Sequence, residues 1–234
     1  AREIPRLPNP SGKDSMESLL RSVAIVGSAN LVTVVLGVIR VKLIAVFFGA
    51  AGVGLWGIYS NFLNTLSTGA GLGIPTSAVQ KIAASPHDEK QIKRILFVVS
   101  ATVIFQGIIA VGLVSFYRTP ISYALTQSEG NSVSIFLVAL AALFAMLSLA
   151  LMSILQGQRQ LALMSKATVL GAVAGTICGI GILLTQHPNS IVLVIMVQPI
   201  CGYLAMAYFA KKAPITRAKR VRLTETFAVW RSLA

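Results

Sequence analysis

Residues 133–156 read VSIFLVALAALFAMLSLALMSILQ, a stretch of 24 residues without a single charge. A helix rises about 1.5 Å per residue, so this stretch is long enough to cross a hydrocarbon core about 30 Å thick. Its apolar residues are continuous and do not alternate with polar ones, which favours a helix over a strand of a membrane barrel. The stretch therefore predicts a transmembrane helix.

Five further apolar stretches of similar length predict five more spans. They cover residues 19–48, 56–84, 94–117, 161–185 and 190–210. The sequence thus predicts an all-α integral membrane protein, a bundle of six transmembrane helices over residues 19–210. Residues 1–18 are expected to form a flexible leader, and residues 211–234 a basic segment with an amphipathic helix at 223–233 that lies on the membrane surface.

The composition of the chain supports a membrane protein. Of its 234 residues, 55% are hydrophobic and 12% are charged, whereas soluble domains carry about 25% charged residues. The 20 Lys and Arg lie between apolar blocks and not in one patch, which argues against a nucleic-acid-binding domain. The chain has no nucleotide-binding glycine loop, no Ser, His and Asp constellation and no His or Cys cluster, so we expect no enzyme activity, metal or cofactor.

The basic residues predict the orientation of the bundle. Seventeen of the 20 lie before the first span, between spans two and three, between spans four and five, or after span six. The other three connections contain one basic residue, Arg118. Because Lys and Arg accumulate on the cytoplasmic side of a membrane, both termini are predicted to be cytoplasmic.

Two cations remain inside the first span, Arg40 and Lys42. An ionisable residue inside a membrane costs at least about 2.5–3.5 kcal/mol on insertion scales, so it normally faces protein or a hydrated cavity. Arg40 continues a helical stripe with Asn30, Thr33 and Gly37, whereas Lys42 points to another side. Each is a candidate for binding an anionic substrate in a cavity. The alternative is that it extends along the helix to the lipid headgroups.

The second span carries its own polar stripe, which includes Asn61, Asn64 and Thr68. Amides and hydroxyls are costly against lipid, so the stripe is expected to face a cavity or another helix. The same span contains Gly71, Gly73 and Pro75, which predict either a hinge in a transporter or simply close helix packing.

Two features of the later spans predict contacts between helices. The fifth span contains a row of glycines spaced four residues apart, Gly171, Gly175 and Gly179, which predicts a closely packed helix pair. Gln106 in the third span and Gln198 in the sixth are isolated amides. Each is expected to make an interhelical hydrogen bond.

Residues 37–83, GVIRVKLIAVFFGAAGVGLWGIYSNFLNTLSTGAGLGIPTSAVQKIA, resemble the start of bacterial polysaccharide-biosynthesis flippases of the Wzx type. The resemblance rests on Arg40 and Lys42, on the turn at residues 49–54, and on the glycine-rich second span. The segment QGQRQLALMSKA at residues 156–167 is also similar to the turn between the family's fourth and fifth spans.

The resemblance implies the multidrug/oligosaccharidyl-lipid/polysaccharide exporter superfamily, whose members have two six-helix lobes around a cavity. This sequence would supply one lobe, as an amino-terminal fragment or a half-size form that pairs with a second lobe. The implied substrate is an undecaprenyl-diphosphate-linked oligosaccharide, an O-antigen or enterobacterial-common-antigen unit, flipped across the bacterial inner membrane. Polysaccharide polymerase machinery is a further implied partner.

Two other functions are open at this point. A multidrug or small-molecule exporter of the same superfamily would usually carry carboxylates inside the membrane, and no Asp or Glu lies within a predicted span. A structural or assembly protein of the membrane would use the polar stripes only to pack its helices.

Overall fold

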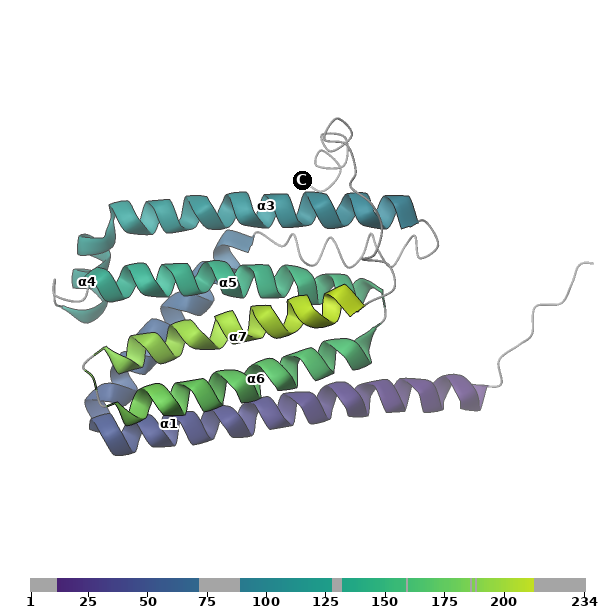
Figure 1. Ribbon diagram of the computed structural model, residues 1–234, viewed down its shortest axis with the longest axis horizontal. Helices are drawn as coiled ribbons and strands as arrows, with labels where there is room; N and C mark the ends of the chain where they lie inside the picture. The colour runs from purple at the N-terminus through teal and green to yellow at the C-terminus, as the bar shows by residue number, and fades with distance from the viewer. Residues whose placement is uncertain are drawn as a thin grey trace, which may run out of the picture.

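The computed structural model describes residues 12–71, 89–127 and 132–212, apart from residues 159, 186 and 188. This part of the chain is helical and contains no strand. Its six helices are α1 (Gly12–Gly71), α3 (Glu89–Phe116), α4 (Arg118–Thr126), α5 (Ser132–Gly157), α6 (Leu161–Leu184) and α7 (Ser190–Lys212) (Figure 1). Five of them, all except α4, are long and apolar enough to cross a membrane.

Helix α1 is two helical arms joined at Gly49. This residue has φ 65° and ψ −163°, a conformation that is almost restricted to glycine because a Cβ atom would clash with the backbone. The first arm runs along one edge of the bundle, and the second arm turns away from it and crosses behind α7 and α5 (Figure 1). A single glycine therefore replaces the connection that we expected over residues 49–55, where the sequence prediction was wrong.

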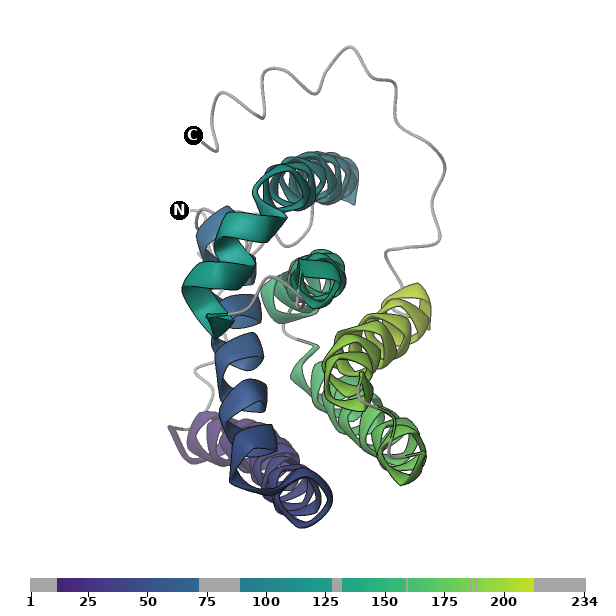
Figure 2. The ribbon, with the colours of Figure 1, turned by 90° about the vertical axis from the view of Figure 1, so that its left-hand side faces the viewer.

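The other helices pack as an antiparallel layer. Helix α5 lies between α3 and α7, and α7 packs along α6, which in turn contacts the first arm of α1. The end-on view shows the second arm of α1 and α4 along one side of α5, with α7 and α6 on the other (Figure 2). Buried apolar side chains, including Tyr59, Ile135, Val138 and Ile195, fill the region where α1, α5 and α7 meet.

The glycine row of α6 is the reason that α6 and α7 pack closely, as the sequence predicted. A Cβ atom placed on Gly171 would lie 2.9 Å from the Cα of Gly202, and one on Gly175 would lie 3.2 Å from the Cα of Gln198. One on Gly179 would lie 3.1 Å from a methyl group of Val194. The absence of three side chains thus brings the α7 backbone against α6.

The predicted spans agree with the observed helices to within a few residues from α3 onward. Two expectations were wrong: the predicted loop at 118–132 contains α4, and α1 already includes residues 12–18, which the sequence assigned to a flexible leader. Helix α4 was missed because it has only nine residues and little apolar content. The rest of the leader, the end of the second span and the amphipathic helix at 223–233 lie outside the described residues.

The described basic residues of the helices after α1 divide between the two ends of the bundle. Lys166 lies near the start of α6, and Lys211 and Lys212 lie at the end of α7, at the same end of the bundle (Figure 1). Arg118 begins α4 at the opposite end. The connections that the sequence placed on opposite sides of a membrane thus lie at opposite ends of the structure.

Candidate functional site

Arg40 is buried inside the bundle, with only 3% of its surface exposed. It lies nine residues before Gly49, about 14 Å along the helix, and hence near the middle of a hydrocarbon core about 30 Å thick. Its Nη1 donates a hydrogen bond to Oε1 of Gln198 on α7, and its Nη2 donates to Oγ1 of Thr176 on α6 at 2.7 Å. The alternative that Arg40 extends to the lipid headgroups is therefore wrong.

The α6–α7 contact positions both acceptors of Arg40. Gly175 touches the backbone of Gln198, which places the amide of Gln198 beside α6 and within reach of α1. Thr176 follows Gly175 and turns its hydroxyl toward α1, while that hydroxyl also donates to the carbonyl of Ala172 at 2.7 Å. Gln198 thus makes the interhelical hydrogen bond that the sequence predicted. The carbonyl oxygen of Gln106, by contrast, is buried without a partner among the described residues.

The charge of Arg40 has no acidic counterpart nearby in the sequence. The closest Asp or Glu on its own helix is Glu17, 23 residues or about 35 Å away along the helix. The third nitrogen of the guanidinium, Nε, is buried without a hydrogen-bond partner. Trp56 on the second arm lies beneath the group, with its ring centroid 5.9 Å from Cζ, at the limit of a cation–π contact. The site therefore contains a buried positive charge that two neutral groups and a ring stabilise.

A cavity of about 410 Å³ opens next to this cluster. Both arms of α1 and helices α5, α6 and α7 line it, and Gln198 and Trp56 belong to its wall. Its polar lining comes from hydroxyl and amide side chains: Thr33, Ser60, Asn64, Ser67, Ser148, Thr168 and Gln198. Its described lining contains no Asp, Glu, Lys, Arg or His, so the cavity offers neutral hydrogen-bonding groups with one guanidinium behind them.

The cavity includes only part of the predicted polar stripe of the second span. Asn64 lines it, whereas Asn61 and Thr68 are exposed and do not, so the three side chains do not share this cavity among the described residues. The face that the arm turns to the cavity instead runs through Ser60 and Ser67. Apolar Trp56 and Leu63 share that face and set which side is buried, because the hydrophobic stripe of a helix faces the core.

Lys42 lies away from the cavity, and most of the predicted hinge lies outside the described residues. Lys42 is exposed on α1, on another side of the helix from Arg40, and it does not line the cavity. Gly71 is the last residue of α1, whereas Gly73 and Pro75 lie outside the described residues. The bend that the structure does contain is at Gly49, and the glycine-rich turn that includes Gly49 was the only sequence signal for it.

The sequence alone missed most of the hydroxyl lining of the cavity. Ser60, Ser67, Ser148 and Thr168 are single hydroxyl residues within apolar stretches, and such residues commonly satisfy themselves by donating to a carbonyl of their own helix. Two of them do so here: Ser67 donates to Asn64 at 3.1 Å and Thr168 to Met164 at 3.0 Å. Only the convergence of four helices shows that their oxygens share one cavity.

No protein-family model matches the chain, and no curated protein or solved structure shows significant similarity to it. The geometry of the cavity and of the Arg40 cluster is therefore the basis for any functional conclusion.

Proposed function

We propose that this chain is one lobe of a transporter that carries a polar, anionic head group on a lipid across a bacterial inner membrane. Its substrate class is an undecaprenyl-diphosphate-linked oligosaccharide, as the resemblance to Wzx-type flippases suggests. The observation that carries the proposal is the cavity of about 410 Å³, which lies among membrane-spanning helices and has hydroxyl and amide groups on its wall. Sugars cannot cross hydrocarbon without such partners, because burying unpaired polar groups is costly.

The buried guanidinium suits an anionic part of the same substrate. Arg40 has no carboxylate partner among the described residues, and Gln198, its neutral partner, also forms part of the cavity wall. A diphosphate that entered the cavity would compete with Gln198 for Nη1 and would offer an acceptor to the unpaired Nε. Hydrogen bonds between a guanidinium and a phosphate are among the strongest in proteins, so this exchange favours the anion.

The bend at Gly49 supports six crossings of the membrane. The apolar part of α1, Val23–Gly69, has 47 residues and would be about 70 Å long if it were straight, more than twice the thickness of a hydrocarbon core. The two arms thus make one crossing each, and the other four long helices make the rest. With the Lys166 end of the bundle in the cytoplasm, both termini are cytoplasmic.

Exposed polar groups on the second arm support a partner lobe. Asn61, Asn64, Thr65 and Thr68 are all exposed on this arm, although it lies within a stretch that is apolar enough to span a membrane. Amide groups facing lipid would be costly, so this surface is expected to face either a second lobe or the hydrated space between two lobes. Alternating access between the lobes would then move the head group outward.

The test is the export of surface polysaccharide by cells that carry Arg40→Met in the full-length gene product. The described partners of Arg40 are neutral, so an apolar side chain of similar size leaves no unpaired buried charge behind, and the variant is expected to fold. Loss of one charged hydrogen bond, worth about 1.5–3 kcal/mol, should weaken head-group binding roughly tenfold to hundredfold. Lys42→Met is the matched control, because Lys42 is a nearby cation that does not line the cavity, and its export should stay near normal.

Normal export by the Arg40→Met protein at normal expression would remove Arg40 from the mechanism. Equal loss in both variants would instead point to a general effect of positive charge in the first span. Loss of export only with Arg40→Met, in a protein that still folds, is the result that the proposal requires.

A further inference from the structure

A second hollow, separate from the cavity, lies between the first arm of α1 and helix α6. It has a volume of about 570 Å³ and is walled mainly by apolar side chains, among them Ile25 and Val32 of α1 and Val169 and Val173 of α6. Phe209 of α7 belongs to its wall as well. We call this hollow the α1–α6 groove. The proposed transport mechanism does not use it.

The groove has the length of one leaflet of a membrane. Its α6 wall runs from Ala162 to Val173, which spans about 16 Å along the helix, whereas half of a hydrocarbon core measures about 15 Å. Val32 and Leu170 on its walls are exposed, as expected for side chains that face lipid. The groove thus matches an acyl chain that lies along the protein within one leaflet.

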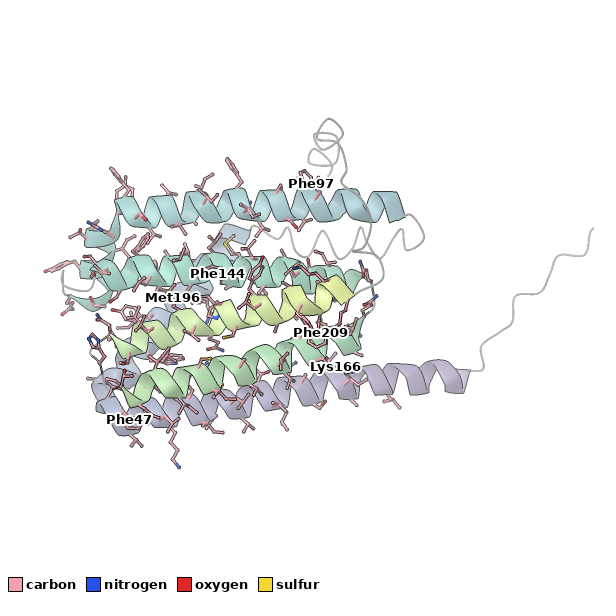
Figure 3. All side chains as sticks on the ribbon, viewed as in Figure 1. Phe47, Phe97, Phe144, Lys166, Met196 and Phe209 are labelled. Atoms are coloured by element: carbon pink, nitrogen blue, oxygen red, sulfur yellow. The ribbon has the colours of Figure 1, made fainter. Side chains whose placement is uncertain are left out.

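Polar groups gather at one end of the groove. Lys166 is exposed and lines the groove one turn inside the start of α6, at the end of the bundle that also holds Lys211 and Lys212. Figure 3 shows Lys166 and Phe209 in the same half of the bundle, nearer the end of α7 than its start. A lysine at the edge of a hydrocarbon core lies at the depth of lipid phosphates, so its charge is complementary to an anionic headgroup.

A buried hydroxyl in the groove wall is an independent sign of a ligand. Ser165, next to Lys166, is only 5% exposed, and its Oγ has no hydrogen-bond partner among the described residues. The other hydroxyls of the helices typically donate to a carbonyl three or four residues earlier, as Ser28 on the opposite wall does to Ile25 at 3.0 Å. Leaving a buried hydroxyl unpaired is costly, and a lipid phosphate or ester oxygen would accept its hydrogen bond.

We propose that the α1–α6 groove binds one anionic phospholipid, with an acyl chain along Val169 and Val173 and its phosphate at Lys166 and Ser165. The lipid would cover the gap between the first arm of α1 and α6 and so hold the arm against the bundle. The occupant is a bulk phospholipid and not the transported substrate, because the groove shares no described lining residue with the cavity.

The experiment is native mass spectrometry of the purified full chain with dipalmitoyl phosphatidylglycerol or with phosphatidylcholine of the same chain length. The wild-type protein should retain one phosphatidylglycerol in preference to phosphatidylcholine. Lys166→Gln should weaken that binding about fivefold, since one basic residue near a charged headgroup contributes that much. Lys211→Gln is the matched control, because this exposed lysine lies at the same end of the bundle outside the groove, and its lipid binding should be unchanged.

A second variant, Leu170→Trp, separates a lipid inside the groove from one held only by charge. Leu170 lines the groove beside Val169 and Val173, where the acyl chain is placed, and it is exposed, so the larger indole fills the groove without entering the core. Loss of the retained phosphatidylglycerol in this variant, at an unchanged unfolding temperature, is the expected result. Retention of the lipid despite the indole would overturn the placement of the acyl chain.

Three other outcomes would also overturn the proposal. Equal effects of Lys166→Gln and Lys211→Gln would mean that the lipid is attracted by the total positive charge at this end of the bundle and not by the groove. Equal retention of the two phospholipids would mean ordinary annular lipid. Displacement of phosphatidylglycerol by equimolar undecaprenyl phosphate, or a dimer that Leu170→Trp dissociates, would assign the groove to the substrate tail or to a second copy of the chain.

Discussion

A methyl group added at Gly171 tests how much the tight α6–α7 contact stabilises the helix bundle. In Gly171→Ala the new Cβ would lie 2.9 Å from the Cα of Gly202 and 3.4 Å from the Cβ of Ala205. Carbon atoms pack best at about 3.5–4.0 Å, so the two helices would have to separate by about 0.6 Å or more. The nearest atom belongs to the backbone, so no side-chain rotation can relieve the clash.

The size of the effect follows from a comparison with Gly181→Ala. Gly181 lies on the same helix, and a Cβ there meets nothing within 4 Å. Alanine raises helix propensity by about 1 kcal/mol over glycine at both positions, so this contribution cancels between the two variants. The difference that remains is the cost of overpacking, about 1–3 kcal/mol. For a chain of this size, 2 kcal/mol corresponds to about 4–8 °C in the midpoint of thermal unfolding.

The measurement is thermal unfolding of the two purified variants in the same detergent, followed by the loss of helical circular dichroism. Gly171→Ala should unfold at a temperature several degrees below Gly181→Ala, while Gly181→Ala should equal or exceed the wild-type protein. Equal midpoints for the two variants would refute the conclusion that the absence of a side chain at Gly171 is what allows α7 to pack against α6.

Two further predictions concern the cavity and the bend. In a protein without its native cysteines, Asn64→Cys and Ser67→Cys should react with a membrane-impermeant maleimide at least about tenfold faster than Val38→Cys, because a thiol reacts only as the thiolate, which requires water. Val38 is exposed on the outside of α1, and equal rates at all three positions would mean that the cavity is dry. Gly49→Ala should lower the free energy of unfolding by about 1–3 kcal/mol, because its φ of 65° with ψ −163° strains any side chain. Gly54→Ala, with open space at its Cβ, should change it by less than about 1 kcal/mol, and similar losses in both variants would contradict the argument from backbone strain.

The length of the continuous apolar stretches was sufficient to predict most of the helices. The spans from residue 94 onward match α3, α5, α6 and α7 closely, because each apolar stretch is bounded by charges or by residues that break a helix. The bend at Gly49 was harder to predict. The stretch from 49 to 55 looks like a turn in composition, yet all but one of its residues are helical, since a single glycine with positive φ is enough to change the direction of the chain.

The candidate site was only partly predictable. Arg40 could be identified because a lone cation in a long apolar stretch has to have a partner in the protein or at the lipid headgroups. Its partners, Thr176 and Gln198, are 136 and 158 residues away, and no local pattern connects a threonine on α6 with an arginine on α1. Of the polar stripe at Asn61, Asn64 and Thr68, only Asn64 lines the cavity, because the stripe lies at one edge of the face that Ser60 and Ser67 turn to it.

The sequence by itself determined that the described part of this chain is helical, that its long apolar stretches can cross a membrane, and that the glycine row on α6 is a packing surface. These properties depend only on the composition of short stretches and on the spacing of residues along the chain. The tertiary structure alone decided which side of each helix faces inward, because that choice depends on apolar residues of other helices. It thereby placed Arg40 inside the bundle, left Lys42 exposed, and assembled a cavity from single hydroxyls on three helices and an amide on a fourth.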